Sequence, residues 1–352
     1  MKTNENIVVE DYYKDKILSS DIPSYWKASQ INNMRIAQHL FDDFRSGIYH
    51  SYNPLQSEKE SKLSRRIEGF LLSLVGNSRY RESVKIFFLK KRIKQLRKQI
   101  EPLVIESFLG KEPLIPQFTL GTFFSNFLPS FFDVHESLVG NPIDLFLLKG
   151  KPYSYEFVEK FIRSELIRRD SQIETQENSF VVDVGGSFGL QIEVLKKRFP
   201  QNKFILIETP SQAYTAWKYL KKVFPNSKII APHELTDESD IAEFEISILL
   251  NDQLSTIGKK PINISSMINQ RSFQEMEWRF VKDYLHFFSS RKVSSIHIWL
   301  MPDGFPHVPK DQKTNQSKIK KFLKEKGYIL ENENLEMIRH DFKFTYTNYN
   351  LK

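Results

Sequence analysis

Residues 180–190 read Phe-Val-Val-Asp-Val-Gly-Gly-Ser-Phe-Gly-Leu, and this stretch decides the fold of the chain. A short β-branched run bounded by glycines is typical of a buried strand. The apolar residues that follow recur with the period of a helix, which predicts a helix over 189–199. Because glycine has no side chain, the turn between them can pass close under a ligand, and the helix N-terminus beyond it offers free N–H donors. The stretch therefore predicts a strand, a tight turn and a helix that cradle a nucleotide-type cofactor.

Two acids stand at the ends of two predicted strands. Asp183 is in the first strand, and Glu208 ends the second, nineteen residues after Gly189. An acid at the second position can accept hydrogen bonds from both hydroxyls of a ribose. The dinucleotide fingerprint needs a third small residue where this chain has Leu190, so its spacing does not fit. The pattern is instead acid-x-Gly-x-Ser-x-Gly.

This pattern resembles the acid-x-Gly-x-Gly-x-Gly loop of the class I methyltransferases, which bind S-adenosylmethionine. Ser187 replaces the middle glycine, and because serine is small we expect the loop to keep its cofactor. The resemblance implies that S-adenosylmethionine is the cofactor and that it contacts the loop, the end of the second strand and a later strand. The residues expected to bind it are Asp183, Gly185, Gly186, Ser187, Gly189, Glu208, Thr209 and Asn269.

Three further motifs resemble a family of sugar O-methyltransferases. They are Gly140-Asn141-Pro142, Glu208-Thr209-Pro210 and the run Asn-Gln-Arg-Ser-Phe-Gln-Glu-Met at 269–276. The matches extend roughly over residues 140–288, with weaker similarity through 25–44. The Ser-Phe-Gln-Glu-Met run is the most discriminating, since it is no general nucleotide-binding signal. The resemblance implies methyl transfer to a sugar hydroxyl, in the biosynthesis of a polysaccharide or glycoconjugate.

The residues that would handle the sugar are expected after the strands of the sheet. A sugar hydroxyl is a weak nucleophile at neutral pH, so a base or a metal is expected near it. Glu275 and His307 are the candidate bases, and Arg271, Gln274 and Asn141 are the candidates for binding the acceptor. Neither position is diagnostic of a base, because an acid in the first turn of a helix is favoured by the helix dipole and a lone loop histidine is commonly solvated. Arg271 stands where the family often has histidine, which argues against a histidine mechanism at that position.

No spacing of His and Asp resembles a dedicated metal site, so no structural metal is predicted and a loosely bound magnesium is left open. The chain has no cysteine, which excludes disulfides, zinc–thiolate sites, iron–sulfur clusters and cysteine nucleophiles.

Two alternatives remain open. The sequence Gly-Gly-Ser-Phe-Gly at 185–189 also fits the Gly-x-Ser-x-Gly elbow of an α/β-hydrolase, with Ser187 as nucleophile and Asp303 with His307 or His340 completing a triad. No glycine-rich oxyanion motif precedes this elbow, and a hydrolase gains nothing from the two acids at the strand ends. Alternatively, the chain binds the cofactor but has lost transfer, and acts as a partner protein.

Beyond about residue 171 the pattern alternates between strands and helices. Such alternation predicts a Rossmann-like, mostly parallel sheet with helices on both faces over 171–352, preceded by a mainly helical region over 1–170 that packs over the cofactor cleft. The polar run 171–178 marks the division. The predicted strands are 180–184, 203–207, 227–230, 245–250, 262–267, 294–300 and an antiparallel 341–349, and the further helices are 210–223, 274–289 and 317–326, the last with Ser317 as N-cap.

Composition limits the partners. The chain has 352 residues and is 40% hydrophobic, enough for one large domain and a smaller one. No apolar stretch approaches the roughly 20 residues of a membrane span, and the first thirty residues are polar and charged, which predicts a cytoplasmic protein. We attribute the net charge of +8 to biased composition and predict no nucleic-acid partner.

One segment is strongly basic. Residues 85–100 have apolar residues at helical spacing and lysines and arginines on the other faces. Such a helix packs its apolar side on the domain, lies on an anionic membrane surface or steers an anionic substrate, and the sequence does not separate these roles. The oligomeric state is equally open.

Overall fold

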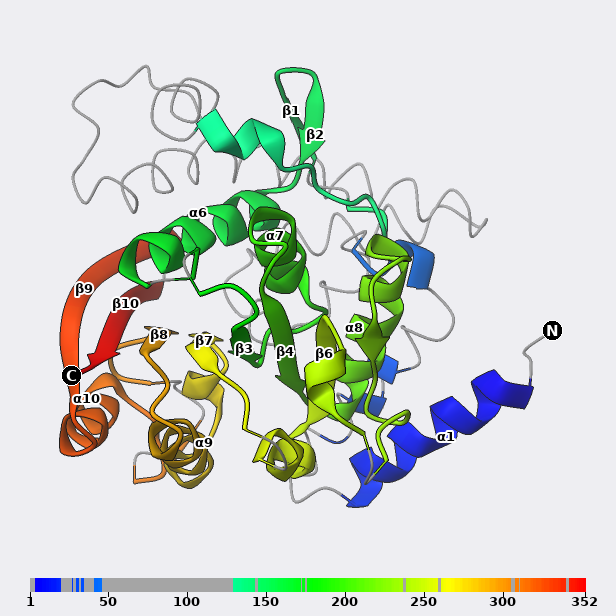
Figure 1. Ribbon diagram of the computed structural model, residues 1–352. Helices are drawn as coiled ribbons and strands as arrows, with labels where there is room; N and C mark the ends of the chain where they lie inside the picture. Colours follow the sequence, from blue (N-terminus) through cyan, green and yellow to red (C-terminus); the bar gives the residue numbers. More distant parts are fainter. Residues whose placement is uncertain are drawn as a thin grey trace, which may run out of the picture.

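A central sheet of eight strands, in the order β5-β6-β4-β3-β7-β8-β10-β9, forms the body of the protein, as the computed structural model shows (Figure 1). The structure describes residues 4–19, 27, 30–31, 33–34, 41–45, 129–142, 145–171, 173–174, 176–236, 239–258, 261–304, 308–309, 311–339 and 342–352. The strands of the sheet are β3 (Phe180–Val184), β4 (Lys203–Glu208), β5 (Ile229–Ile230), β6 (Ile246–Leu250), β7 (Ile264–Gln270), β8 (Ser295–Leu300), β9 (Tyr328–Arg339) and β10 (Phe342–Leu351).

Helices cover both faces of this sheet (Figure 1). One face is covered by α6 (Tyr155–Asp170), α7 (Leu190–Arg198) and α8 (Pro210–Val223), and the other by α9 (Trp278–Ser290) and α10 (Gln316–Glu325). The first helix, α1 (Asn4–Ser19), packs against α8, and the hairpin of β1 (Phe146–Leu148) and β2 (Lys151–Tyr153) precedes α6. Short 3-10 helices are η1 (Phe41–Asp43), η3 (Pro129–Asp133), η4 (Ile241–Glu243), η5 (Asn251–Gly258) and η6 (Phe273–Glu275).

The strands from β5 to β8 are parallel, and β10 runs antiparallel between β8 and β9. Side chains of a strand point alternately to its two faces, so each central strand feeds two cores. In β3, Val181 packs with the α6, α7 and α8 side, while Val182 packs with the α9 and α10 side. Because both faces are buried, the strands are apolar almost throughout, as the sequence shows.

The predicted Rossmann-like α/β fold is confirmed, with its parallel strands and its antiparallel final strand. The structure corrects several details. β7 runs on to Gln270, β9 was not predicted, and the helix expected over 274–289 is the 3-10 turn η6 followed by α9. The N-cap of α10 is Asn315, not Ser317, because the Asn315 side chain accepts a hydrogen bond from the Lys318 N–H at 3.0 Å.

Described parts of the N-terminal region pack onto the glycine turn. The ring of Phe44 contacts that of Phe188 edge to face, and the guanidinium of Arg45 lies over the same Phe188 ring. Arg45 also forms a buried ion pair with Glu136, whose carboxylate accepts hydrogen bonds from the backbone N–H and hydroxyl of Ser154, the N-cap of α6. One buried carboxylate thus fastens two N-terminal segments to the start of α6. The basic segment 85–100 lies outside the described residues.

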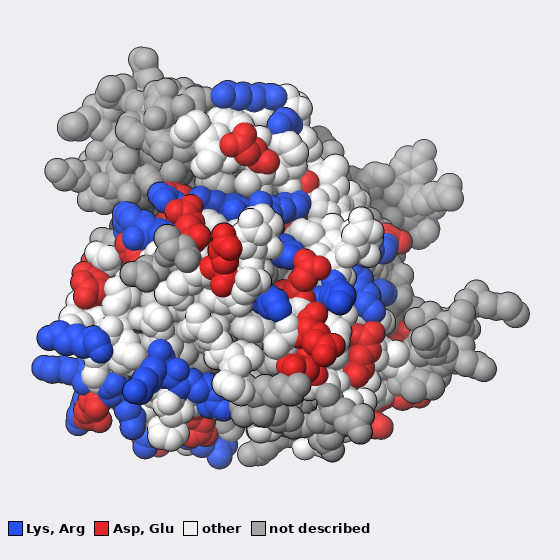
Figure 2. Space-filling view, in the orientation of Figure 1, with Lys and Arg blue, Asp and Glu red and all other residues white. Residues whose placement is uncertain are grey.

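The surface facing the reader in Figure 2 has lysines and arginines gathered over α9 and α10. On α10 the lysines alternate with buried Ile319, Phe322 and Leu323, so this charge is the solvent side of an amphipathic helix. Among the described residues, no helix combines the length and apolar content that a membrane crossing requires.

The buried ion pair yields a stability prediction. Glu136→Ala should lower the free energy of unfolding by about 3 kcal/mol, because it leaves the Arg45 charge buried without its partner. The matched control is Glu333→Ala, which removes a half-exposed carboxylate 2.7 Å from Lys320 and should cost less than about 1 kcal/mol. Urea denaturation measures both; equal losses would contradict the role of the buried pair.

Candidate functional site

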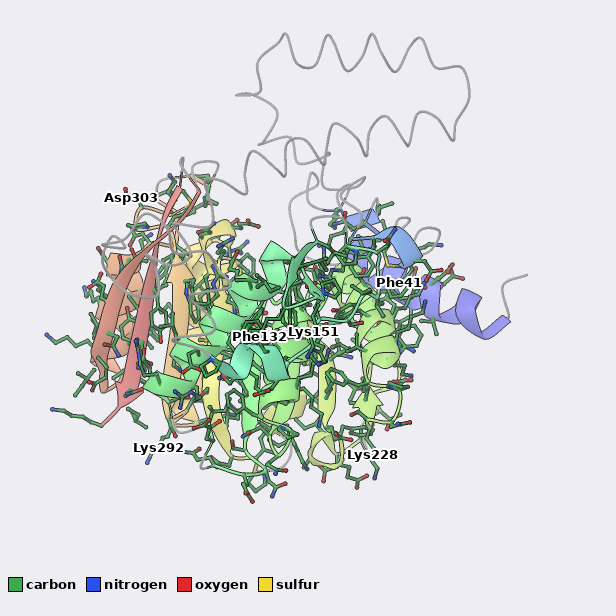
Figure 3. The ribbon with its side chains drawn as sticks, turned by 90° about the horizontal axis from the view of Figure 1, so that it is seen from above. Phe41, Phe132, Lys151, Lys228, Lys292 and Asp303 are labelled. Atoms are coloured by element: carbon green, nitrogen blue, oxygen red, sulfur yellow. The ribbon has the colours of Figure 1, made fainter. Side chains whose placement is uncertain are left out.

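The candidate site lies where the parallel strands end. In Figure 3, Lys228 and Lys292, which precede β5 and β8, lie at one edge of the sheet, and Asp303, which follows β8, lies at the opposite edge. Ligands of open α/β sheets bind outside the carboxyl ends of the strands. The candidate site lies at the edge of Asp303, where the parallel strands end. Three segments meet that edge: the glycine turn after β3, Glu208 at the end of β4, and the turn after β7.

The glycine turn has no room for side chains at two of its positions. Gly185 has a φ of 75°, and a Cβ there would come within 2.0 Å of the Ser272 hydroxyl. A Cβ on Gly186 would come within 2.2 Å of the Asp183 carboxylate. Gly189 has a φ of 93° and is the N-cap of α7. These close approaches explain why the chain has glycines here: the backbone itself forms the wall of the site.

Ser187 takes a left-handed conformation that usually favours glycine. Its φ is 57°, its side chain is exposed, and its hydroxyl lies 3.4 Å from the Gln212 side-chain oxygen. The structure offers the hydrolase interpretation no support, since the partner of this hydroxyl is an amide. His307 and His340, the triad candidates, lie outside the described residues.

Glu208 holds the glycine turn in place. One carboxyl oxygen accepts the Ser187 N–H at 2.6 Å, and the other accepts the N–H of Thr209, the N-cap of α8, at 2.8 Å. Burial raises the pKa of this carboxyl to about 7, although the two backbone hydrogen bonds lower it. The second oxygen, Oε2, also accepts the Thr209 hydroxyl at 3.4 Å, whereas Oε1 has only the Ser187 N–H as donor and keeps a lone pair that can accept from a ligand hydroxyl.

Asp183 is the most unusual group of the site. Its side chain is fully buried, and neither carboxyl oxygen has a hydrogen-bond partner among the described residues. Burial raises the pKa of this carboxyl to about 7, while the charges of Lys160 and Arg163 oppose the rise. A buried polar group without a partner costs free energy, so this carboxyl is poised for a donor that the described residues do not supply.

The two cations come from α6 and were missed in the sequence. Lys160 Nζ donates to Gln270 Oε1 at 2.7 Å, and Arg163 donates to the same oxygen at 2.9 Å. The Gln270 amide nitrogen donates in turn to Gln191 of α7 at 2.7 Å. Burial lowers the pKa of Lys160. In the sequence these two residues are a lysine and an arginine three positions apart in an amphipathic segment. Such a pair is typical of the solvent-exposed face of a helix, so it did not indicate a buried site.

The turn after β7 is braced from inside. The Asn269 amide donates to Val184 O at 2.8 Å and also to the Ser272 hydroxyl, and its oxygen accepts the Phe273 N–H at 3.1 Å. Asn269 thus ties the end of β7 to the end of β3. Its direct contact with a cofactor stays a prediction.

The three acceptor-side residues of this turn differ in their surroundings. Arg271 has a φ of 72° and donates to Glu159 of α6 at 2.7 Å. Gln274 is buried and its side-chain oxygen accepts the Met301 N–H at 3.0 Å, which joins η6 to the end of β8. Glu275 is exposed to solvent, yet the surrounding protein desolvates its carboxyl enough to raise the pKa to about 7. It lies in η6, before α9, so the favourable helix dipole expected for it does not apply.

Asn141 lies elsewhere. It has a φ of 51° in a surface turn in which the carbonyl of its neighbour Gly140 accepts the Arg45 N–H at 2.6 Å. The preceding Ser137 donates its N–H to Glu193 of α7 at 2.7 Å. Its turn thus contacts the N-terminal segment and α7, whereas the other acceptor candidates follow β7. His307 lies outside the described residues. Within the part that the structure describes, no group of three or more His, Cys, Asp or Glu side chains is arranged to hold a metal ion.

Comparisons with known proteins found solved structures that resemble this chain at low sequence identity. No family model and no curated protein matches the chain. Solved structures that resemble it include a SAM-dependent methyltransferase from Aquifex aeolicus, with 14% identity, a TM-score of 0.38 and coverage of 56% of this chain and 94% of that one. Magnesium protoporphyrin IX methyltransferase from Synechocystis, with bound SAM, has 8% identity, a TM-score of 0.36 and coverage of 57% and 86%. The site is therefore defined by the strand order of this chain and by the geometry of its own glycine turn.

The glycine turn can be tested by two opposite substitutions. Gly185→Ala should destabilise the protein by about 2 kcal/mol or more, because the new methyl group meets Ser272 in a left-handed conformation. Ser187→Gly should be neutral or stabilise it by up to about 1 kcal/mol, since glycine adopts that conformation freely. Chemical denaturation measures both. A loss of stability on Ser187→Gly equal to that of Gly185→Ala would contradict this account.

The buried carboxyl of Asp183 should make stability depend on pH. Its pKa is about 7 in the folded protein and about 3.9 in an unfolded chain. As the pH rises from about 4 to 7 the unfolded chain loses this proton first, so the stability falls. Asp183→Asn should therefore be more stable than the parent at pH 8, on the order of 3 kcal/mol, and lose this advantage by pH 4. The measurement is the free energy of unfolding of both proteins between pH 4 and pH 8. If the difference between them does not change with pH, the raised pKa of Asp183 is refuted.

Proposed function

We propose that this protein is an S-adenosylmethionine-dependent O-methyltransferase that acts on a sugar hydroxyl. The observation that carries the proposal is the buried Asp183 carboxyl, which has no partner among the described residues and lies near Lys160 and Arg163, against Gly186 of the glycine turn. The amino-acid end of the cofactor has one ammonium and one carboxylate, and these two kinds of protein group are their complements.

Each part of the cofactor has a candidate partner. Asp183 would accept from the ammonium group, and Lys160 with Arg163 would donate to the carboxylate. Glu208 would accept from the ribose hydroxyls, through the free lone pair of Oε1 and by exchanging the long 3.4 Å contact between Oε2 and the Thr209 hydroxyl. The glycines would let the backbone approach the ligand, with Ser187, Thr209 and Asn269 shaping the same wall. When bound, the cofactor supplies an electrophilic methyl group on a positively charged sulfur.

The acceptor hydroxyl must lose its proton. Glu275 is the base that the structure supports best, since its carboxyl is accessible to solvent and has a pKa of about 7. A base with a pKa near the working pH is the most effective. Arg271 and Gln274, on the same turn, would orient the acceptor, and Asn141 or His307 would join only if other segments bring them to it. No metal is needed in this scheme.

The sugar itself is supported by the resemblance of residues 269–276 and 140–142 to sugar O-methyltransferases. The similar structures include a protein named for a different acceptor, magnesium protoporphyrin IX, so the fold leaves the acceptor class open. A cytoplasmic site of action, in biosynthesis of a polysaccharide or glycoconjugate, belongs to the same proposal.

Cofactor binding is testable by isothermal titration with S-adenosylhomocysteine. Glu208→Ala should weaken binding about 100-fold, because hydrogen bonds to a charged group contribute about 1.5 to 3 kcal/mol each. Glu333→Ala, an exposed carboxylate on β9, is the matched control and should bind like the parent. If the parent protein does not bind S-adenosylhomocysteine, the assignment of the cofactor is wrong, and the methyltransferase proposal is refuted with it.

Transfer requires a separate assay with labelled S-adenosylmethionine and a panel of sugars. Glu275→Gln should lower kcat by about 10² to 10⁴ while the affinity for the cofactor is kept, and the parent rate should fall as the pH drops below about 7. If a non-sugar hydroxyl compound added beside the sugars is labelled and the sugars are not, the proposed acceptor class is wrong. Cofactor binding without label on any acceptor would favour the inactive partner protein.

A further inference from the structure

A cavity that opens to solvent lies at the edge of the sheet where the parallel strands begin, away from the glycine turn. Its volume is about 530 Å³, and it is lined by the last turn of α6, the start of β8 and parts of β9 and β10. Cavities of this size hold small organic ligands. None of its lining residues takes part in the site described above.

Two side-chain carbonyls in this cavity are unsatisfied. Neither Asn348 Oδ1 nor Asn350 Oδ1 has a hydrogen-bond partner among the described residues, and the Asn348 side chain is fully buried. The two residues are two apart on β10, so they share a face at a spacing of about 7 Å. The Asn348 amide nitrogen donates to Asp170 O at 3.1 Å, which directs its oxygen away from that contact. Two acceptors on one face therefore lack donors among the described residues, and a ligand with O–H or N–H groups would satisfy them.

The other polar groups of the cavity are held rigidly. The Arg169 side chain donates to one Asp170 carboxyl oxygen at 2.9 Å, and the Tyr346 hydroxyl donates to the other at 2.8 Å. Tyr346 is bonded in turn to His297, whose second ring nitrogen is 3.1 Å from the Ser295 hydroxyl. Two lining residues, Asp170 and Ser295, are thus connected behind the cavity wall by hydrogen bonds through Tyr346 and His297.

Charge narrows the class of ligand. The lining residues include one cation, Arg169, whose charge is neutralised by Asp170, and one further carboxylate, the exposed Glu331. The remaining polar groups are amides and hydroxyls, such as Ser294. An anionic ligand would meet net negative charge and two unsatisfied acceptors, which disfavours phosphates and nucleotides.

We propose that this cavity binds a small molecule that presents several O–H or N–H donors and carries no negative charge. Neutral sugars and aliphatic amines both present such donors to amide carbonyls. The site is separate from the cofactor site and does not depend on the proposed function.

Isothermal titration of the full-length protein with four probes tests this. Maltose represents neutral sugars, glucosamine an aminosugar, spermidine a polyamine and glucose 6-phosphate an anionic sugar. We expect saturable binding of at least one of the first three, and a loss of at least tenfold in Asn350→Leu. The matched control is Asn226→Leu, at an exposed asparagine in the turn after α8, which should bind like the parent.

Asn350→Asp keeps the shape of the side chain and distinguishes the two classes of ligand, neutral sugars and aliphatic amines. The added negative charge should raise the affinity for spermidine or glucosamine about tenfold and leave that for maltose equal or weaker. Thermal unfolding of each variant confirms that it is folded. The proposal is overturned if no probe binds saturably, which would mean that water fills the cavity, if glucose 6-phosphate binds best, or if folded Asn350→Leu binds like the parent.

Discussion

The Glu208 carboxylate is the interaction on which the candidate site depends. Its side chain accepts one N–H from Ser187 in the glycine turn and one from Thr209, the N-cap of α8. Together with the backbone hydrogen bond from the Gly185 N–H to the Ile207 carbonyl at 2.9 Å, it anchors the turn from Gly185 to Gly189 on the β4 side. The residue proposed to recognise the ribose is therefore also the one that shapes the turn around it.

Three carboxyls at this edge of the sheet have pKa values raised to about 7, those of Asp183, Glu208 and Glu275. Asp183 lies one residue before the end of β3, Glu208 ends β4, and Glu275 lies in η6 after β7. Such clustering of perturbed groups in one place is typical of functional sites. Its cost is visible in Asp183, whose buried oxygens lack donors from the described protein.

Much of the fold could be predicted because strands buried on both faces and helices with one apolar stripe leave plain periodic patterns. β9 escaped prediction because its sequence, Tyr-Ile-Leu-Glu-Asn-Glu-Asn-Leu-Glu-Met-Ile-Arg, is too polar to alternate clearly. The acids at the strand ends were found from spacing alone. Lys160 and Arg163 were not, because what buries them is the contact of α6 with β7 and α7, and tertiary contacts of this kind leave no local signal.

The η6 turn was mistaken for a helix for a related reason. Residues 273–275 continue the apolar pattern of the helix that follows. Met276 and Glu277 are extended, however, and Glu277 forms an antiparallel bridge with Lys313, so η6 and α9 are separate elements. Glu275 therefore lies in the 3-10 turn η6, beside buried Phe273 and Gln274, and not in the first turn of α9. Its side chain remains in contact with solvent, and the protein around it desolvates the carboxyl enough to raise the pKa, which no pattern in the sequence displays.

Trp299 gives the molecule a built-in optical reporter. Its fully buried indole lies 5.4 Å from the guanidinium of Arg163, which donates to Gln270 at the end of β7, and stacks at 4.5 Å on Tyr346, which donates to Asp170 in the wall of the cavity. Indole emission responds to nearby charge and to ring stacking. Trp299 is one of four tryptophans, so a variant with Trp26, Trp217 and Trp278 replaced by phenylalanine would leave it as the one indole fluorophore, whose emission would register events at either edge of the sheet without any label being attached.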